Sequence, residues 1–169
     1  IGCDVNRNAL DIAKKRLDIT IGEGAIELIE EDARELESIK ENSVKLICTH
    51  PPYSNIIKYS NKNNKDISLL PLEGFLKAME DVAEESYRVL ENSGVCAIMM
   101  GDIRKKGCVI PLGFNVLNIF LSKKFILKEI IIKEQFNCSS TNYWREISIK
   151  RNFLLLAHEY IFVFHKSRL

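Results

Sequence analysis

Apolar and polar residues alternate along the chain with two different periods. Short apolar runs predict strands at 1–5, 26–29, 44–48, 95–100, 126–132 and 159–164. Between residues 75 and 90, apolar side chains recur every three or four positions, which predicts a helix with a wide buried face. Weaker helical patterns occupy 8–17, 33–39 and 111–121. Since strands alternate with helices, the pattern predicts an α/β fold with a mostly parallel sheet covered by helices.

Two long polar segments, 54–70 and 133–152, fit neither period. We predict that both are loops, the kind of segment that most often carries function. Tyr143 and Trp144 in the second segment are candidate contact residues. No repeat or change in composition divides the sequence, so residues 1–169 are expected to form one domain.

Composition and charge narrow the class of protein. The chain is 46% hydrophobic and 28% charged, as expected for a globular protein with a packed core. Its formal net charge of +1 gives no global attraction to nucleic acid, so phosphate contacts must come from local basic patches. No apolar run approaches the roughly 18 residues that a membrane span needs, so no membrane contact is expected.

The cysteines are odd in number and widely spaced: Cys3, Cys48, Cys96, Cys108 and Cys138. They lack the short paired spacings of thiolate metal sites, so we predict no metal centre. Most of them lie in apolar, strand-like runs, which predicts reduced and buried thiols. Reduced cysteines without a targeting pattern favour a cytoplasmic location.

Acidic residues follow two of the predicted strands. In an open α/β sheet, ligands bind beyond the carboxyl ends of the strands. A carboxylate at Asp4 suits the two hydroxyls of a ribose, although it would equally suit the free amides of a helix start. Asp32, with the backbone amide of Ala33, matches the edge of an adenine, although a surface acid is the simpler interpretation of Asp32 alone. The order of these features along the chain favours the binding roles.

The turn after the third strand is the most specific signal. Pro51 and Pro52 fix their φ angles and remove two backbone donors, which leaves a stiff turn whose carbonyls are available to a ligand. The ring of Tyr53 is then placed to stack on a flat base that has been turned out of its helix. A rigid strand-ending turn with a packed tyrosine is the structural alternative.

The segment Thr49-His50-Pro51-Pro52-Tyr53 resembles the catalytic motif of the amino-group DNA methyltransferases, the N6-adenine and N4-cytosine family. In that family, Asp, Asn or Ser precedes Pro-Pro and an aromatic residue. Gly2-Cys3-Asp4 is similar to the family's ribose-binding segment, Glu31-Asp32-Ala33 to its adenine-contacting segment and residues 159–166 to its closing strand. The resemblance implies a Rossmann-like methyltransferase sheet, mostly parallel with an antiparallel C-terminal strand, and one catalytic domain.

The resemblance also implies a cofactor, a partner and residue roles. The cofactor would be S-adenosyl-L-methionine, bound by Asp4, Val5, Asp32 and Ala33. The partner would be DNA, or alternatively RNA. The catalytic residues would be His50, Pro51, Pro52 and Tyr53. Substrate-binding residues would be Ser54, Asp102, Arg104 and Lys105, with the basic residues Lys58, Lys62, Lys65 and Lys106 either contacting phosphates or lying on a solvated surface.

The implied reaction needs positioning rather than a strong base or a metal. An acceptor at the first motif position and a nearby backbone carbonyl hold the N–H groups of the target amine and draw its nitrogen toward a tetrahedral geometry. The nitrogen then attacks the sulfonium methyl in line, and a proton leaves afterwards. Orientation of the two reactants supplies most of the rate.

Two features depart from the family pattern. First, His50 stands where the family has Asp, Asn or Ser, so the acceptor would be a neutral imidazole nitrogen, which requires a pH above roughly 6.5. Second, the family's N-terminal strand and its glycine-rich loop are missing from this sequence. We therefore expect a gap in the sheet between the strands ending at Asp4 and His50, filled by an N-terminal segment of a longer polypeptide or by another chain.

Three alternatives remain beside DNA methylation. The first two alternatives are a methyltransferase for an RNA base and a methyltransferase for a glutamine side chain in a protein. The glutamine methyltransferases use the motif Asn-Pro-Pro-Tyr. His50 favours neither of them over DNA. The third alternative is a non-catalytic, methyltransferase-like fragment that has lost its cofactor loop.

Overall fold

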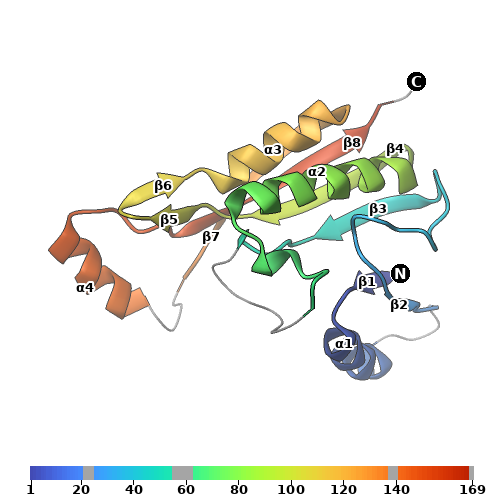
Figure 1. Ribbon diagram of the computed structural model, residues 1–169, viewed down its shortest axis with the longest axis horizontal. Helices are drawn as coiled ribbons and strands as arrows, with labels where there is room; N and C mark the ends of the chain where they lie inside the picture. The colour runs from blue at the N-terminus through green and yellow to red at the C-terminus, as the bar shows by residue number, and fades with distance from the viewer. Residues whose placement is uncertain (21–24, 55–62, 137–140, 168–169) are drawn as a thin grey trace.

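The structure is a computed structural model that describes residues 1–20, 25–54, 63–136 and 141–167 (Figure 1). Its elements, in chain order, are β1 (Gly2–Asp4), α1 (Arg7–Thr20), β2 (Leu28–Glu30), β3 (Val44–Thr49), η2 (Ile67–Leu69), α2 (Leu72–Val89), β4 (Leu90–Met100), β5 (Ile103–Lys105), β6 (Cys108–Ile110), α3 (Leu112–Ser122), β7 (Phe125–Glu134), α4 (Thr141–Arg151) and β8 (His158–Lys166). Lys58, Lys62 and Cys138 lie outside the described residues.

The main sheet has the strand order β3-β4-β8-β7. Strands β3 and β4 are parallel, whereas β8 is antiparallel to both of its neighbours. The C-terminal strand is therefore reversed, as expected. The expectation of a mostly parallel sheet is confirmed only in part. The pairs β1–β2 and β3–β4 are parallel, but β8 lies inside the sheet, so both of its ladders are antiparallel.

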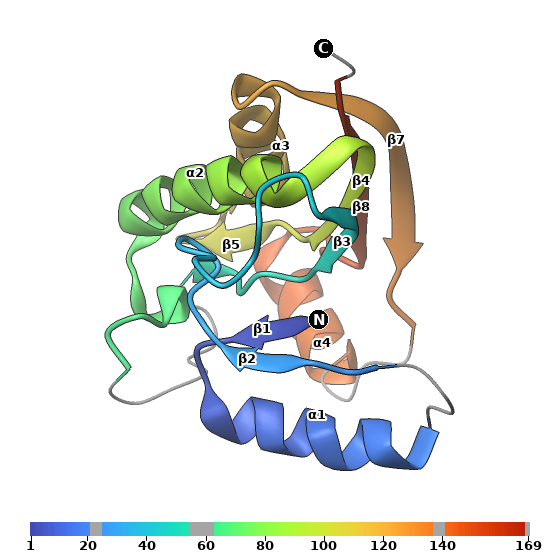
Figure 2. The same ribbon diagram turned by 90° about the vertical axis from the view of Figure 1, so that its right-hand side faces the viewer.

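Helices α2 and α3 pack on the same face of this sheet (Figure 2). Alternate residues of β4 and β8, including Ile98, Met100 and Phe162, are fully buried against them. Phe75 of α2 and Phe120 of α3 are likewise fully buried in this core. Burial of each large apolar side chain contributes roughly 1.5–3 kcal/mol, so this layer is the main source of stability.

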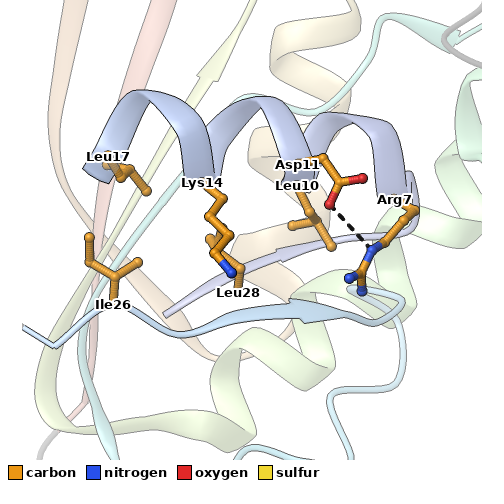
Figure 3. A pocket seen from close by; sticks show the side chains of 7 residues that line it. All are labelled: Arg7, Leu10, Asp11, Lys14, Leu17, Ile26 and Leu28. Carbon is orange, nitrogen blue, oxygen red and sulfur yellow. Dashed lines mark ion pairs between the residues drawn. The ribbon is translucent and has the colours of Figure 1, made fainter. Parts of the chain in front are cut away.

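The N-terminal elements form a separate small unit, in which β1 pairs in parallel with β2 and α1 covers them. Leu10 and Leu17 point from α1 toward Ile26 and Leu28 across a shallow hollow of about 190 Å³ (Figure 3). Among the described residues, the β1-β2 pair has no hydrogen-bonded ladder to the main sheet. The sheet therefore consists of two pieces.

Residues 33–39, expected to be a helix, form turns instead. Their backbone groups bond to side chains of α2 in place of helical partners. Leu36 donates its N–H to Glu85 at 2.9 Å, and Arg88 donates to the carbonyl oxygens of Leu36 at 2.7 Å and Ile39 at 3.1 Å. These long-range bonds satisfy the segment without a helix, so the local pattern was misleading.

The prediction of a loop over 133–152 is wrong, because β7 continues to Glu134 and α4 occupies Thr141–Arg151. Within α4, Ser148 is the buried residue, so the helix has no apolar stripe that could have revealed it. The short hairpin of β5 and β6, which carries Arg104 and Lys105, was also missed.

The prediction of buried thiols is confirmed at Cys96 and wrong at Cys48 and Cys108, which are exposed. Cys48 lies on β3 between the partly buried Ile47 and Thr49, on the opposite face, and Cys108 lies on the outer hairpin. No described helix is long and apolar enough to cross a membrane. The described residues include no cluster of His, Cys, Asp or Glu suited to a metal ion.

Candidate active site

The diproline turn begins where β3 ends, at the carboxyl edge of the main sheet. Pro51 is buried, Pro52 and Tyr53 are half-buried, and His50 is exposed. Gly101 follows the end of the neighbouring strand β4 and lies beside the ring of Tyr53. The turn is therefore held against the sheet by its tyrosine, while His50 remains accessible.

A series of hydrogen bonds extends from His50 into the sheet. The Nε2 atom of His50 lies 2.9 Å from the hydroxyl of Tyr53, and that hydroxyl donates to Oε1 of Glu159 at 2.5 Å. Lys133 donates to the other oxygen, Oε2 of Glu159, at 2.6 Å. Lys133 and Glu159 stand directly opposite each other on β7 and β8. The first residue of the motif is thus connected to two strands near the C-terminus.

The carboxylate of Glu159 is buried, with 5% of its surface exposed. Burial by itself would raise the pKa of Glu159. Hydrogen bonds from Lys133, Tyr53 and Gln135, together with the charge of Lys133, outweigh burial and lower this pKa from 4.5 to about 2. Glu159 is therefore a carboxylate at any pH at which the protein would function.

This lowered pKa predicts sensitivity to acid. A carboxyl group whose pKa is lower in the folded protein stabilises the fold above its unfolded pKa of 4.5, and the stabilisation is lost as the pH falls toward 2. The expected loss is up to about 3 kcal/mol. Urea unfolding between pH 6 and 2.5 should show this loss in the wild type and a much smaller pH dependence in Glu159→Gln. If the unfolding free energies of the two proteins depended equally on pH, Glu159 would not be the source of the acid sensitivity.

A cavity of about 420 Å³ lies beside the turn, between the two pieces of the sheet. Its lining includes every predicted cofactor-binding residue and the first three residues of the motif: Asp4, Val5, Asp32, Ala33, His50, Pro51 and Pro52. Tyr53 does not line it. The structure therefore brings together the ends of β1, β2 and β3, as the sequence predicts for ligands of parallel sheets.

The far wall of the cavity was mostly missed by sequence reasoning, which named only Lys65 there, as a candidate phosphate contact. Asn63, Lys65, Asp66 and Ile67 line it, and the side chain of Asn63 donates to the carbonyl oxygen of Val5 at 2.8 Å. These residues come from the polar segment after the motif, which has no periodicity to place it. The only indication in the sequence was the expectation that segment 54–70 is a loop that carries function.

The two acids differ in their surroundings. Asp4 is exposed and accepts from the backbone N–H of Asn6 at 2.7 Å. Asp32 is buried, and both of its carboxylate oxygens accept from the guanidinium of Arg34, at 3.0 and 2.6 Å. Burial would raise the pKa of Asp32, but the bonds from Arg34 lower it overall. Asp32 is therefore ionised, and its orientation is fixed.

The predicted substrate-binding residues have structural partners or lie at the surface, and they do not line the cavity. Ser54 is 1% exposed and donates to the carbonyl oxygen of Leu70. Asp102 accepts from the N–H of Gly113 at 3.0 Å, at the start of α3. Arg104 donates to backbone carbonyls and stacks on a phenylalanine ring. Lys105 is exposed on β5. Their roles in substrate binding stay predictions.

Gly101 is required for the packing of Tyr53. A methyl group at this position would lie 3.2 Å from the ring, which its hydrogen bonds hold in place. Gly101→Ala is therefore expected to cost about 1–3 kcal/mol in unfolding free energy. Gly74→Ala is the matched control: the added methyl has contacts of 3.6 Å or more, to Leu70 and Pro71 just before α2, so it should stabilise by about 0.5–1 kcal/mol. Equal effects of both changes in denaturant titrations would refute this packing role.

Comparison with known families gives one match that covers most of the chain. A family model described as DNA methylase matches residues 44–169. The type II methyltransferase M.BglII of Bacillus subtilis is 38% identical over 88 residues, which are 52% of this chain and 22% of that protein. The orphan methyltransferase M.BamHII of Bacillus amyloliquefaciens is 26% identical over 132 residues, 78% of this chain and 42% of its own length. The chain thus spans less than half of these relatives.

Solved structures have the same fold. TTHA0409 of Thermus thermophilus, assigned as a DNA modification methylase and crystallised with S-adenosyl-L-methionine, aligns with a TM-score of 0.59 and 26% identity. The alignment covers 82% of this chain and 54% of that one. The cytosine-N4-specific PvuII DNA methyltransferase aligns with a TM-score of 0.62 at 21% identity, over 81% of this chain and 48% of that one. The latter likeness concerns the fold alone.

Proposed function

Since this chain belongs to the DNA methylase family, we propose that it forms the catalytic domain of a DNA methyltransferase that modifies the exocyclic amine of adenine or cytosine. The observation that carries the proposal is the cavity in which two strand-end carboxylates meet the diproline turn. Such a site suits a nucleoside-containing cofactor on one side and a base amine on the other. Residues 1–169 would all belong to this one domain, as an N-terminally incomplete part of it.

S-adenosyl-L-methionine is the cofactor, and the cavity fits it chemically. Asp4 offers an exposed carboxylate for ribose hydroxyls, and Asp32 with the amide of Ala33 offers an acceptor and a donor for adenine. Because Arg34 occupies part of the acceptor capacity of Asp32, the amide of Ala33 would contribute more of the adenine recognition. When bound, the cofactor supplies an electrophilic methyl group.

The residues of the turn would orient the target amine. His50 is exposed at the cavity and would accept one N–H of the amine. A backbone carbonyl of the rigid diproline turn would accept the second N–H, which draws the nitrogen toward a nucleophilic geometry. Tyr53 would present its ring to the base while its hydroxyl remains fixed to Glu159. Asp102, Arg104 and Lys105 would lie nearer to the DNA backbone, whereas Ser54 is buried and would not contact it.

A further strand would complete the sheet. Among the described residues, β1 and β3 each have one hydrogen-bonded neighbour, and Leu46 of β3 is 58% exposed. An exposed apolar strand edge is unfavourable in water, so we propose that another segment or chain pairs there. The same strand would close the cofactor site on the side of β1.

The decisive experiment is transfer of a labelled methyl group from S-adenosyl-L-methionine to duplex DNA, with RNA and protein as parallel acceptors. Nuclease digestion and chromatography of the labelled base distinguish N6-methyladenine from N4-methylcytosine. Labelling of RNA or of a glutamine side chain instead would overturn the DNA assignment, and cofactor binding without transfer would support the non-catalytic alternative.

Cofactor affinity tests the ribose role of Asp4. Asp4→Ala should weaken binding of S-adenosyl-L-methionine about 10- to 100-fold in calorimetry, because hydrogen bonds to a charged group are lost. Asp11→Ala is the matched control, since Asp11 is an exposed acid of α1 outside this cavity. An unchanged affinity in Asp4→Ala would place the ribose elsewhere.

A further inference from the structure

The hydrogen bonds around Tyr53 have a fixed direction. Glu159 is a carboxylate and therefore only accepts hydrogen bonds. The hydroxyl of Tyr53 has one proton, which it donates to Oε1 of Glu159 at 2.5 Å. Toward His50, at 2.9 Å, the same hydroxyl can then act only as an acceptor. The Nε2 atom of His50 must therefore carry a proton.

This direction determines which nitrogen of His50 is basic. A neutral imidazole has one donor and one acceptor nitrogen, and the hydrogen bond made by one of them selects the tautomer. With the proton on Nε2, the lone pair lies on Nδ1. We propose that Glu159, Lys133 and Tyr53 are positioning residues that hold His50 as its Nε2–H tautomer, so that Nδ1 accepts an N–H of the target amine.

This inference rests on the proposed function and explains the departure of His50 from the family motif. An Asp, Asn or Ser at this position always offers an oxygen acceptor, whereas an imidazole offers one only on the correct nitrogen. The hydrogen-bonded series His50–Tyr53–Glu159 selects the nitrogen of His50 that carries the proton. Glu159 does this from β8, 106 residues away from Tyr53 in the sequence. Lys133 keeps Glu159 charged and in place through its bond to Oε2.

The protonated state of His50 would be unsuitable. Its Nε2 lies 3.8 Å from Oε1 of Glu159, so an imidazolium would be attracted to this carboxylate. Both of its nitrogens would then be donors, and none could accept from the amine. Tyr53 separates the two groups and makes the hydrogen bond with each of them. The hydroxyl of Tyr53 is therefore the critical part of the series.

Nitrogen NMR of the full 169-residue chain tests the tautomer without any need for catalysis. The chain has three histidines, which histidine-specific labelling resolves. At a pH where His50 is neutral, its Nε2 should show the shift of a protonated nitrogen and its Nδ1 that of an unprotonated one. In Tyr53→Phe, the ratio of this tautomer to the other should fall about fivefold, as expected for the loss of one hydrogen bond.

The matched control is Tyr160→Phe. Tyr160 forms a similar set of contacts nearby, with Nε2 of His158 at 3.0 Å and a carboxylate oxygen of Asp102 at 3.4 Å. This change should alter the signals of His158 and leave those of His50 as they are. Glu159→Gln is a second variant, because its amide can donate to Tyr53, reverse the hydroxyl and again lower the Nε2–H population.

A predominant Nδ1–H tautomer in the wild type would overturn the inference even if methyl transfer is observed. So would His50 signals that are the same in the wild type, Tyr53→Phe and Glu159→Gln. Conversely, a wild type that has the expected tautomer and binds S-adenosyl-L-methionine but transfers no methyl group would overturn the proposed function in favour of the non-catalytic alternative and leave the positioning series intact. In an active protein, Tyr53→Phe should lower kcat about tenfold while the affinity for S-adenosyl-L-methionine stays the same.

Discussion

Replacement of His50 by alanine is expected to lower kcat for methyl transfer about 100- to 1000-fold, the range found when one preorganised hydrogen-bonding group is removed from an active site. His50 lines the cavity and precedes the rigid diproline turn, so it is placed to polarise the target amine. Alanine has no acceptor, and the amine would then remain conjugated with its ring. Cofactor binding should change little, because the expected ribose and adenine contacts follow β1 and β2.

His50→Asn is the informative rescue. Asparagine supplies a side-chain oxygen at this position, as in the family motif, and needs no tautomer control. It should keep kcat within about tenfold of the wild type. His165→Ala is the control, because it removes a histidine from β8 outside the cavity and should leave the rate of methyl transfer unchanged. Single-turnover rates are the measurement. Full activity in His50→Ala would transfer the acceptor role to Thr49 or to a backbone carbonyl.

The candidate site was predictable because its parts are local. Asp4, Asp32 and the diproline turn each follow a strand that the apolar pattern reveals, and parallel strands bring their carboxyl ends to one edge. No long-range information is needed for that step. The family motif then gave the turn its chemical meaning.

The partners of the motif were not predictable from local patterns. Glu159 and Lys133 meet because β7 and β8 pair in one particular register. A shift of that register by one residue would turn each side chain to the other face of the sheet. The turns at 33–39 were unpredictable for the same reason, because Glu85 and Arg88 of the distant helix α2 determine their conformation. Long-range polar contacts overrode local propensity in both cases.

The same kind of contact appears at the opposite end of β8, where Lys166 is 6% exposed. Its Nζ donates to the carbonyl oxygens of Tyr87 at 2.7 Å and Leu90 at 2.8 Å, and to Oδ1 of Asn42 at 2.7 Å. The ammonium group also lies over the ring of Tyr87. Burial lowers the pKa of Lys166, which reflects the cost of removing this charge from water.

Lys166→Met should therefore be destabilising, by about 2–4 kcal/mol in unfolding free energy, because three neutral acceptors lose a charged donor. Methionine retains the apolar stem but leaves the carbonyl groups at the end of α2 without their donor, and unsatisfied buried acceptors cost roughly 1–3 kcal/mol each. Urea unfolding followed by circular dichroism measures the change. Lys128→Met on β7, an exposed lysine, should stay within about 0.5 kcal/mol of the wild type. A Lys166→Met protein as stable as this control would mean that the junction between α2 and β4 is held by apolar packing alone.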